Sequence, residues 1–379
     1  MTAASQKLLL TFLYGSDGTL PSGSAGLPAA TQTYWLGKML KGGFSVLPSP
    51  NLQTDPLVLG NSAIPQGFKA QKNSIAQSPL PLKVQPLDLV PFHVAMGKTE
   101  KSASLGSAFP DYKTSLNPTG DVPAVCWHRE DNRLYSDQVR EYYESKCTKQ
   151  SVGFEDDLLT CDMEFLLQRE YKTSMNQLTV LPIRRGNTSP VQGYCVRHPS
   201  LSCTWFYGTG DGTTRTLTSL FRGFSYTIEP KITPDDEEDG NDYAAALQAH
   251  ASWKISDIIL EVAMDPANQV LNALRAIAGD GYTGAYTTAA HTTADTTSVL
   301  QVTLPRRHIN DYLQFRWNQV HLRRIEYPKE QAQCIDGFPT AKLVFADPWD
   351  IQVWERQCNA AGTSTYNEIA TYEEPAAYA

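Results

Sequence analysis

The stretch from Leu158 to Arg169, LLTCDMEFLLQR, decides the fold of this 379-residue chain. Its apolar side chains alternate with polar ones: Leu159, Cys161, Met163 and Phe165 against Thr160, Asp162 and Glu164. A period of two places one set of side chains in a core and the other toward solvent. The sequence therefore predicts a strand with one buried face.

The same alternation recurs farther along the chain. Phe224, Tyr226 and Ile228 alternate with Ser225 and Thr227. Residues 203–230, CTWFYGTGDGTTRTLTSLFRGFSYTIEP, predict two strands around a Gly-rich turn. Further strands are expected in SWKISDIILEVAMDP (252–266), TSVLQVTLP (297–305), VHLRRIEY (320–327), TAKLVFA (340–346) and WDIQVWER (349–356). Only 19% of the residues are charged. This pattern indicates a mainly β protein, a β-sandwich or flattened barrel.

One helix is expected among these strands, at about 266–278. Asp265 can cap its N-terminus, Pro266 suits its first position and Gly279 can close it. Its apolar stripe consists of Val270, Leu271, Leu274 and Ile277. The prediction is a helix that flanks the β core.

Domain organisation follows from composition. Residues 1–120 are rich in proline, which removes ladder donors, and predict an N-terminal arm with edge strands integrated into the fold. Residues 121–358 form the predicted β-sandwich core, with loop insertions near 182–215 and 233–246. Residues 359–379 form a C-terminal tail.

Charge and cysteine content exclude several classes of protein. The net charge of −8 supplies no basic field for tight, sequence-specific DNA binding. Seven cysteines without a C-x-x-C pair predict mostly free, buried thiols. The apolar run from Leu8 to Leu13 is too short for the core of a signal peptide, and no membrane span is recognisable. We expect synthesis in a cytoplasm.

Motifs for chemistry are missing from the sequence. The acidic run Asp235 to Gly240 begins like a calcium loop, but its twelfth position is Ala246, so a solvated acidic loop is the preferred interpretation. His128 lies in WHRED, where a polar cluster at a strand end is preferred over an acid–base pair. We expect no enzyme activity, no metal and no cofactor.

Basic residues cluster at Arg306-Arg307 and around Arg323. Alternation splits the second cluster over two faces, so it forms no coherent nucleic-acid groove. We expect Arg306, Arg307 and Arg323 to contact the acidic loop of a neighbouring subunit. That loop contributes Asp235, Asp236 and Glu237.

The order of these features resembles the tail tube proteins of long-tailed (siphovirus-like) viruses of bacteria or archaea. The similar segments are LPLKVQPLDLVPFHVAMG (80–97), ESKCTKQSVGFEDDLLTCDMEFLL (144–167), LFRGFSYTIEPKI (220–232), ASWKISDIILEVAMDPANQVLNAL (251–274) and VLQVTLPRRHINDYLQFRWNQVHLRRIEYPKEQAQ (299–333). The resemblance covers residues 80–350 loosely. Its motifs are those of a fold rather than of invariant residues.

This resemblance implies a virion protein of the tail that assembles with itself. Six-membered rings would stack into a hollow tube, and long loops and arms would bridge the subunits. Implied partners are a tape-measure protein, tail terminator and tip proteins, and viral DNA that passes without sequence-specific binding. Thr160, Asp162 and Glu164 are the candidates for the lumen face, where carboxylates would repel phosphates.

Other classes remain open. A tail terminator, baseplate hub or capsid decoration protein could use a similar sandwich. A carbohydrate-binding β-sandwich would suit the 7 Trp and 18 Tyr, because aromatic faces stack on sugars. A hydrolase with scattered carboxylates is a third class. Electron microscopy and glycan binding would separate these alternatives.

Overall fold

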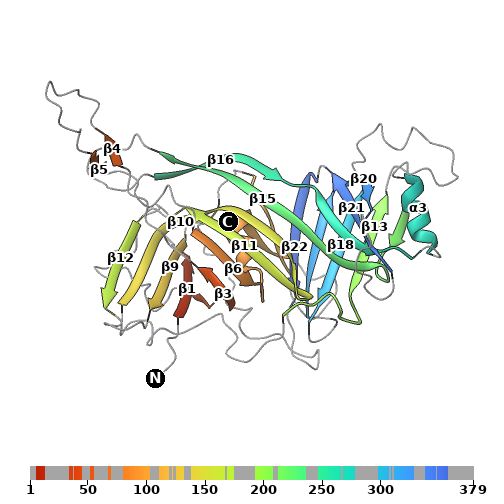
Figure 1. Ribbon diagram of the computed structural model, residues 1–379, viewed down its shortest axis with the longest axis horizontal. Coiled ribbons are helices and arrows are strands. Elements are labelled where there is room, and N and C mark those ends of the chain that lie inside the picture. Colours follow the sequence, from red (N-terminus) through yellow and green to blue (C-terminus); the bar gives the residue numbers. More distant parts are fainter. Residues whose placement is uncertain are drawn as a thin grey trace.

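The structure is a computed structural model. It describes residues 6–12, 34–36, 38–44, 52–54, 67–69, 80–102, 111–118, 122, 125–131, 138–166, 169–174, 193–207, 212–235, 246–265, 268–277, 298–306, 309, 311–327, 338–346 and 348–356. Two large antiparallel sheets and two short helices make up these ranges (Figure 1). The prediction of a mainly β protein is confirmed.

The larger sheet has 13 strands. Its path runs β2 (Tyr34–Leu36), β1 (Gln6–Phe12), β9 (Val125–Asp131), β10 (Gln138–Glu155), β15 (Phe221–Asp235), β17 (Ile258–Ala263), β21 (Thr340–Ala346) and β20 (His321–Glu326). Five more strands branch from this path: β11 (Leu158–Leu166), β6 (Leu80–Gln85), β3 (Lys38–Phe44), β12 (Arg169–Ser174) and β16 (Ala246–Ile255).

The smaller sheet has 7 strands. Their order is β14 (Thr213–Thr216), β13 (Ser202–Tyr207), β18 (Val299–Pro305), β19 (Tyr312–Asn318), β22 (Asp350–Arg356), β8 (Asp111–Leu116) and β7 (Gly97–Ser102). A separate pair joins β4 (Leu52–Thr54) to β5 (Gly67–Lys69). No described helix is long and apolar enough to cross a membrane.

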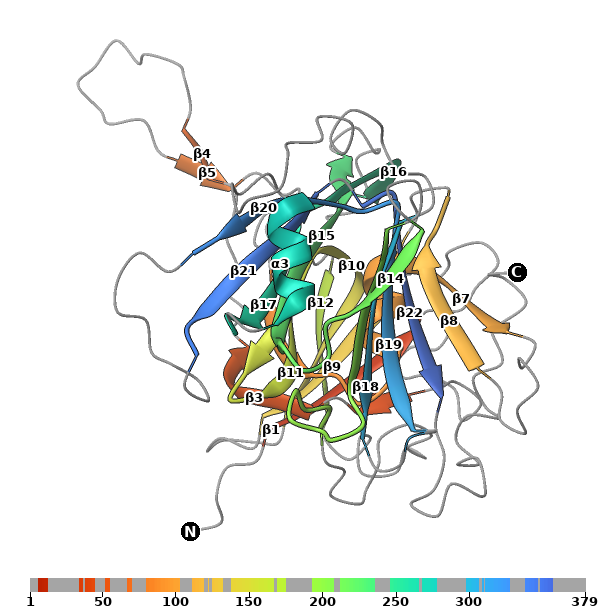
Figure 2. The same ribbon diagram turned by 90° about the vertical axis from the view of Figure 1, so that its right-hand side faces the viewer.

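An aromatic core joins the two sheets, which Figure 2 shows as two layers. Phe224 of β15 lies 4.8 Å from Phe315 and 5.3 Å from Trp317 of β19, between ring centroids. Trp205 of β13 meets Phe345 of β21 at 5.3 Å. All five rings are buried. Such packing of two inner faces is consistent with a β-sandwich.

Helix α1 (Val90–Met96) lies inside this core, and all seven of its residues are buried. Phe92 packs edge-on against Phe315 at 5.4 Å, and Gln150 Nε2 donates a hydrogen bond to the carbonyl oxygen of Pro91 (2.8 Å). Gly97 ends the helix with φ 89°, which favours glycine. The sequence interpretation did not identify α1. A seven-residue helix that is buried on every side has no amphipathic stripe to reveal it.

Strand β11 confirms the prediction made for Leu158 to Arg169, although it ends at Leu166. The four predicted core side chains are all buried: Leu159, Cys161, Met163 and Phe165. A two-residue turn, Asp156 (φ 49°) and Asp157 (φ 64°), joins β10 to β11. Positive φ at both positions matches the twist of a tight hairpin.

Some element boundaries differ from the prediction. Helix α3 (Gln269–Ile277) begins after Asn268, whose Oδ1 accepts hydrogen bonds from Val270 N (3.0 Å) and Leu271 N (3.3 Å). Asn268, not Asp265, therefore caps the helix. The helix lies near β20 at one end of the long axis (Figures 1 and 2).

Two strand assignments also change. The single strand predicted in 252–266 is divided between β16 and β17, with the break at Ser256-Asp257. Residues 202–216 form β13 and β14, which agrees with the two strands predicted around a Gly-rich turn but not with the loop insertion predicted near 182–215. Buried Cys203 and Trp205 make β13 part of the core.

Candidate interaction surface

The outer face of the larger sheet concentrates charge on five adjacent strands. We call this surface the charged face, and it comprises Lys83 of β6, Asp162 and Glu164 of β11, Lys149 and Ser151 of β10, Thr227 and Glu229 of β15, and Lys254 of β16. The period of two that buries the neighbouring residues directs these side chains outward.

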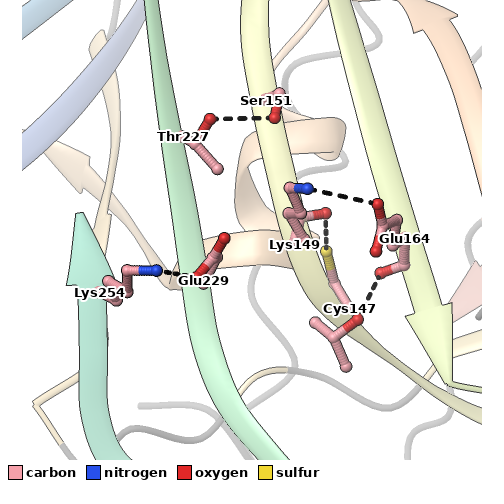
Figure 3. Close-up of polar contacts among 8 residues, drawn as sticks. Cys147, Lys149, Ser151, Glu164, Thr227, Glu229 and Lys254 are labelled. Atoms are coloured by element: carbon pink, nitrogen blue, oxygen red, sulfur yellow. Dashed lines mark hydrogen bonds and ion pairs between the residues drawn. The ribbon is translucent and has the colours of Figure 1, made fainter. Parts of the chain in front are cut away.

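One row of the charged face alternates in sign from strand to strand. Lys149 Nζ lies 3.5 Å from Glu164 Oε1, and Lys254 Nζ lies 3.0 Å from Glu229 Oε2 (Figure 3). The strands follow the order β11, β10, β15, β16, so the row alternates carboxylate, ammonium, carboxylate, ammonium. Opposite charges directly across antiparallel strands stabilise the pairing modestly.

A second row lies beside the first. Lys83 Nζ is 2.8 Å from Glu155 and 3.9 Å from Asp162. The hydrogen bond to Glu155 is the largest cause that raises the pKa of Lys83. Ser151 Oγ and Thr227 Oγ1 are hydrogen-bonded at 3.0 Å (Figure 3). Lys83 and Asp162 have opposite charges within this row, and Glu155 adds one further carboxylate beside it.

These contacts change the interpretation of the three lumen candidates. Asp162 is exposed and Glu164 half-buried on the predicted outer face, but Thr160 is only 8% exposed. Each of the two carboxylates lies within ion-pair distance of a lysine. The face is therefore charge-balanced rather than acidic. The alternation in KCTKQSVGFE (146–155) indicates that Lys149 and Ser151 point outward. The sequence interpretation did not use this signal.

A shallow hollow of about 620 Å³ opens on the charged face. Its lining includes three lysines, Lys149, Lys231 and Lys254, and two glutamates, Glu164 and Glu229. Lys231 is exposed, and no ion pair of its side chain with another described residue is observed. The hollow thus has an excess of one positive charge. It suits an acidic surface or segment better than a basic one.

The inward side of the same strands holds thiols that are chemically inert. Cys147 is fully buried, its Sγ donates to the carbonyl oxygen of Lys149 (3.4 Å; Figure 3), and burial raises its pKa to about 12. Burial also raises the pKa of Cys161 well above its ordinary value. A thiol that stays protonated is no nucleophile. The four cysteines with described side chains, Cys147, Cys161, Cys195 and Cys203, are free, and only Cys195 is not buried.

Arg306 does not lie on the surface. It is 7% exposed, and its guanidinium forms two hydrogen bonds with Asp311, from Nη2 (3.0 Å) and Nε (3.3 Å). A third goes from Nη1 to the carbonyl oxygen of Leu87 (2.9 Å), and the Tyr194 ring lies 4.9 Å away. Burial opposes the charge, but Tyr194 and Asp311 outweigh it and raise the pKa of Arg306. The subunit contact predicted for Arg306 is wrong, because its charge is satisfied within its own chain.

The remaining candidates divide into two groups. Arg323 is exposed and lies 3.6 Å from Asp257 of its own chain. Arg307, Asp236 and Glu237 lie outside the described residues, as does the side chain of Asp235 at the end of β15. The side chain of His128 on β9 also lies outside them.

A second hollow, of about 490 Å³, lies beside the β10–β11 turn. Arg197 and Asp157 form an ion pair at its edge (2.6 Å), and Phe154 and Phe221 lie in its wall. His198 Nδ1 accepts a hydrogen bond from Ser200 N (3.1 Å), so that nitrogen is occupied. No base and nucleophile are paired here within the described chain.

Comparison with known proteins adds no assignment. Among the residues that the structure describes, no group of three or more His, Cys, Asp or Glu is placed to hold a metal ion. No family model and no curated protein matches the chain.

Proposed function

We propose that this chain is a structural virion protein that assembles with itself into a tail tube. The observation that carries the proposal is the hairpin of β15 and β16. Beyond Ile228, β15 pairs with no described strand other than β16. Figure 1 shows the two strands running side by side along the molecule.

A two-stranded ribbon of this length is marginally stable by itself in water. Its edges pair with no other described strand, and the N–H and C=O groups of such edges can add to a neighbouring sheet. Contact with another subunit would stabilise the ribbon and pair the backbone groups on its edges. A hairpin that bridges subunits therefore supports self-assembly, whereas a monomeric binding module has no need of it.

In the proposed assembly, a β-sandwich with a flanking helix and bridging arms forms rings that stack into a tube. The family resemblance implies six subunits in each ring. Tape-measure, terminator and tip proteins would be the partners, DNA would pass through without sequence-specific binding, and the tail of the virion would be the location after synthesis in the host cytoplasm. We assign the charged face to contacts between subunits rather than to the lumen, because paired charges repel phosphates weakly.

Negative-stain electron microscopy of the purified full chain tests the proposal. Stacked rings or tubes are expected at high protein concentration, and single rings would indicate a terminator. Deleting residues 232–249 and joining the strands by Asn-Gly removes the paired outer end of the hairpin. This deletion should abolish stacking while the far-UV circular dichroism spectrum remains that of a β protein. Only monomers at every concentration would refute self-assembly.

A carbohydrate-binding module is the second candidate, because of Trp349. Its side chain is 76% exposed in the turn before β22, the largest exposure of any large apolar residue described. Exposed aromatic rings can stack on sugar rings. Binding on a glycan array that is lost in Trp349→Ala would favour this function over a tube.

A further inference from the structure

The connection between β15 and β16 is unusually acidic. Residues 236–245, DEEDGNDYAA, contain five carboxylates and no lysine or arginine. Asp235 extends the run on the strand itself. Such a run repels itself and gains free energy from a basic partner.

The hollow of the charged face offers complementary charge near the other end of the same hairpin. Lys231 and Lys254 lie on the two strands of the hairpin, and Lys149 lies on the adjacent strand β10. Glu229 pairs with Lys254 six residues before the last pair, Asp235 with Ala246. At about 3.3 Å per residue, the hollow centre lies about 20 Å from the start of the acidic connection.

Because of this distance, the acidic connection can bind the hollow of a neighbouring copy more easily than the hollow of its own chain. Both ends of the ten-residue connection are fixed to the strands. Its middle can therefore lie at most about 17 Å from them, which is half the length of the fully extended segment. It would have to lie stretched along its own strands to approach Lys149 and Lys254. A neighbouring copy displaced along the hairpin has no such restriction.

We propose that the acidic connection 236–245 of one copy binds the hollow on the charged face of the next copy. This inference rests on the proposed self-assembly and names the contact that makes it. The contact joins two different surfaces, one from each copy. Repeated in one direction it produces rings or filaments, whereas a reciprocal exchange between two copies would give a two-fold dimer. The sequence interpretation gave the basic side of the contact to Arg306, Arg307 and Arg323. The geometry points to Lys149, Lys231 and Lys254 instead.

A peptide experiment tests the contact separately from assembly. A fluorescent peptide of residues 233–246, TPDDEEDGNDYAAA, is titrated with the full chain below the concentration at which it assembles, and anisotropy is recorded. Binding is expected that weakens as salt rises, because the contact is an exposed charge pairing. The same peptide with Asn and Gln in place of Asp and Glu should bind at least about tenfold more weakly.

Substitutions locate the binding site. Lys231→Glu breaks no described ion pair and should weaken binding of the peptide. The double variant Lys231→Glu/Lys254→Glu should weaken it further, by about tenfold relative to the natural protein. A peptide with Lys in place of its acidic residues should prefer the double variant to the natural protein. Lys342→Glu on β21, an exposed lysine outside the hollow, is the matched control and should bind normally.

The outcomes separate the two proposals. The protein could form tubes although the peptide does not bind, or although the peptide binds both variants as well as it binds the natural protein. Either result would overturn the contact and leave the tube proposal intact. Peptide binding that follows the charge reversals without any tubes would support the contact and refute the tube.

Discussion

The two faces of the strands β10, β11 and β15 differ in nearly every property although they share a backbone. The inner face carries Cys161, Met163 and Phe224, all buried in the hydrophobic core. The outer face carries Lys149, Glu164 and other charged side chains in alternating rows. Neighbouring residues in the sequence therefore have separate roles, one in folding and the other in interaction.

The free energies on the two faces should differ accordingly. A buried aromatic side chain contributes several kcal/mol through desolvation and packing. Exposed ion pairs contribute about 0 to 1 kcal/mol each, because water screens them and ordering long side chains costs entropy. Substitutions on the two faces should thus separate loss of folding from loss of assembly.

The largest effect is expected inside the core. Phe315→Ala removes a ring, 1% exposed, that contacts Phe92, Phe224 and Trp317. It should lower the free energy of unfolding by about 4 kcal/mol, as measured by urea titration. Ile309→Ala, at 61% exposure, is the control and should change it by less than about 0.5 kcal/mol. A loss below about 1 kcal/mol for Phe315→Ala would contradict the described core.

A slightly smaller loss is expected when the buried ion pair is broken. Asp311→Asn leaves the Arg306 charge uncompensated inside the protein and should cost about 3 kcal/mol in the same assay. Glu326→Gln removes the partner of Arg324 in an exposed pair (2.7 Å) and should cost less than about 1 kcal/mol. Equal effects of the two changes would show that burial does not distinguish these pairs.

Alkaline pH should destabilise the protein through its inner face. The pKa of Cys147 is raised from its ordinary 9.0 to about 12, so the folded chain keeps a proton that the unfolded chain loses. Stability is full below pH 9 and declines as pH rises toward 12. At pH 10.5 this thiol alone should account for about 2 kcal/mol. Urea titrations at pH 8 and 10.5 should show a smaller decline for Cys147→Ala; an identical decline would exclude this thiol as a cause.

The smallest effect on stability is expected on the charged face. Lys149→Gln removes the 3.5 Å pair with Glu164 and should lower the free energy of unfolding by about 0.5 kcal/mol. Thermal unfolding of the variant beside the natural protein measures this. A loss above about 2 kcal/mol would mean that the outer face contributes to folding, and the division between the two faces would fail.

The sequence predicted the β class and the inward residues of β11 and β15, because alternation is a local signal. It missed β19, although Leu313, Phe315 and Trp317 alternate, because the strand closely follows Pro305 and the basic pair Arg306-Arg307, which are typical of a surface loop. Arg306 was misplaced for the same reason. Its partner, Asp311, is only five residues away, but burial depends on the far strands and on Leu87.

The charged face could be predicted only in part. Alternation placed Asp162 and Glu164 outward, yet their lysine neighbours come from β6 and β10, and that registry is a tertiary property. The hollow likewise forms where β10, β11, β15 and β16 meet. No single stretch of sequence contains it.

Strand β10 has a mechanical consequence for the molecule. Its first part, Gln138 to Tyr143, is bonded to β9 and β12, and its later part, from Lys146 onward, to β11 and β15. Tension along β10 would load these hydrogen bonds in shear, many at once, rather than opening them one by one. A single continuous strand of 18 residues thus acts as a tie between the two halves of the larger sheet.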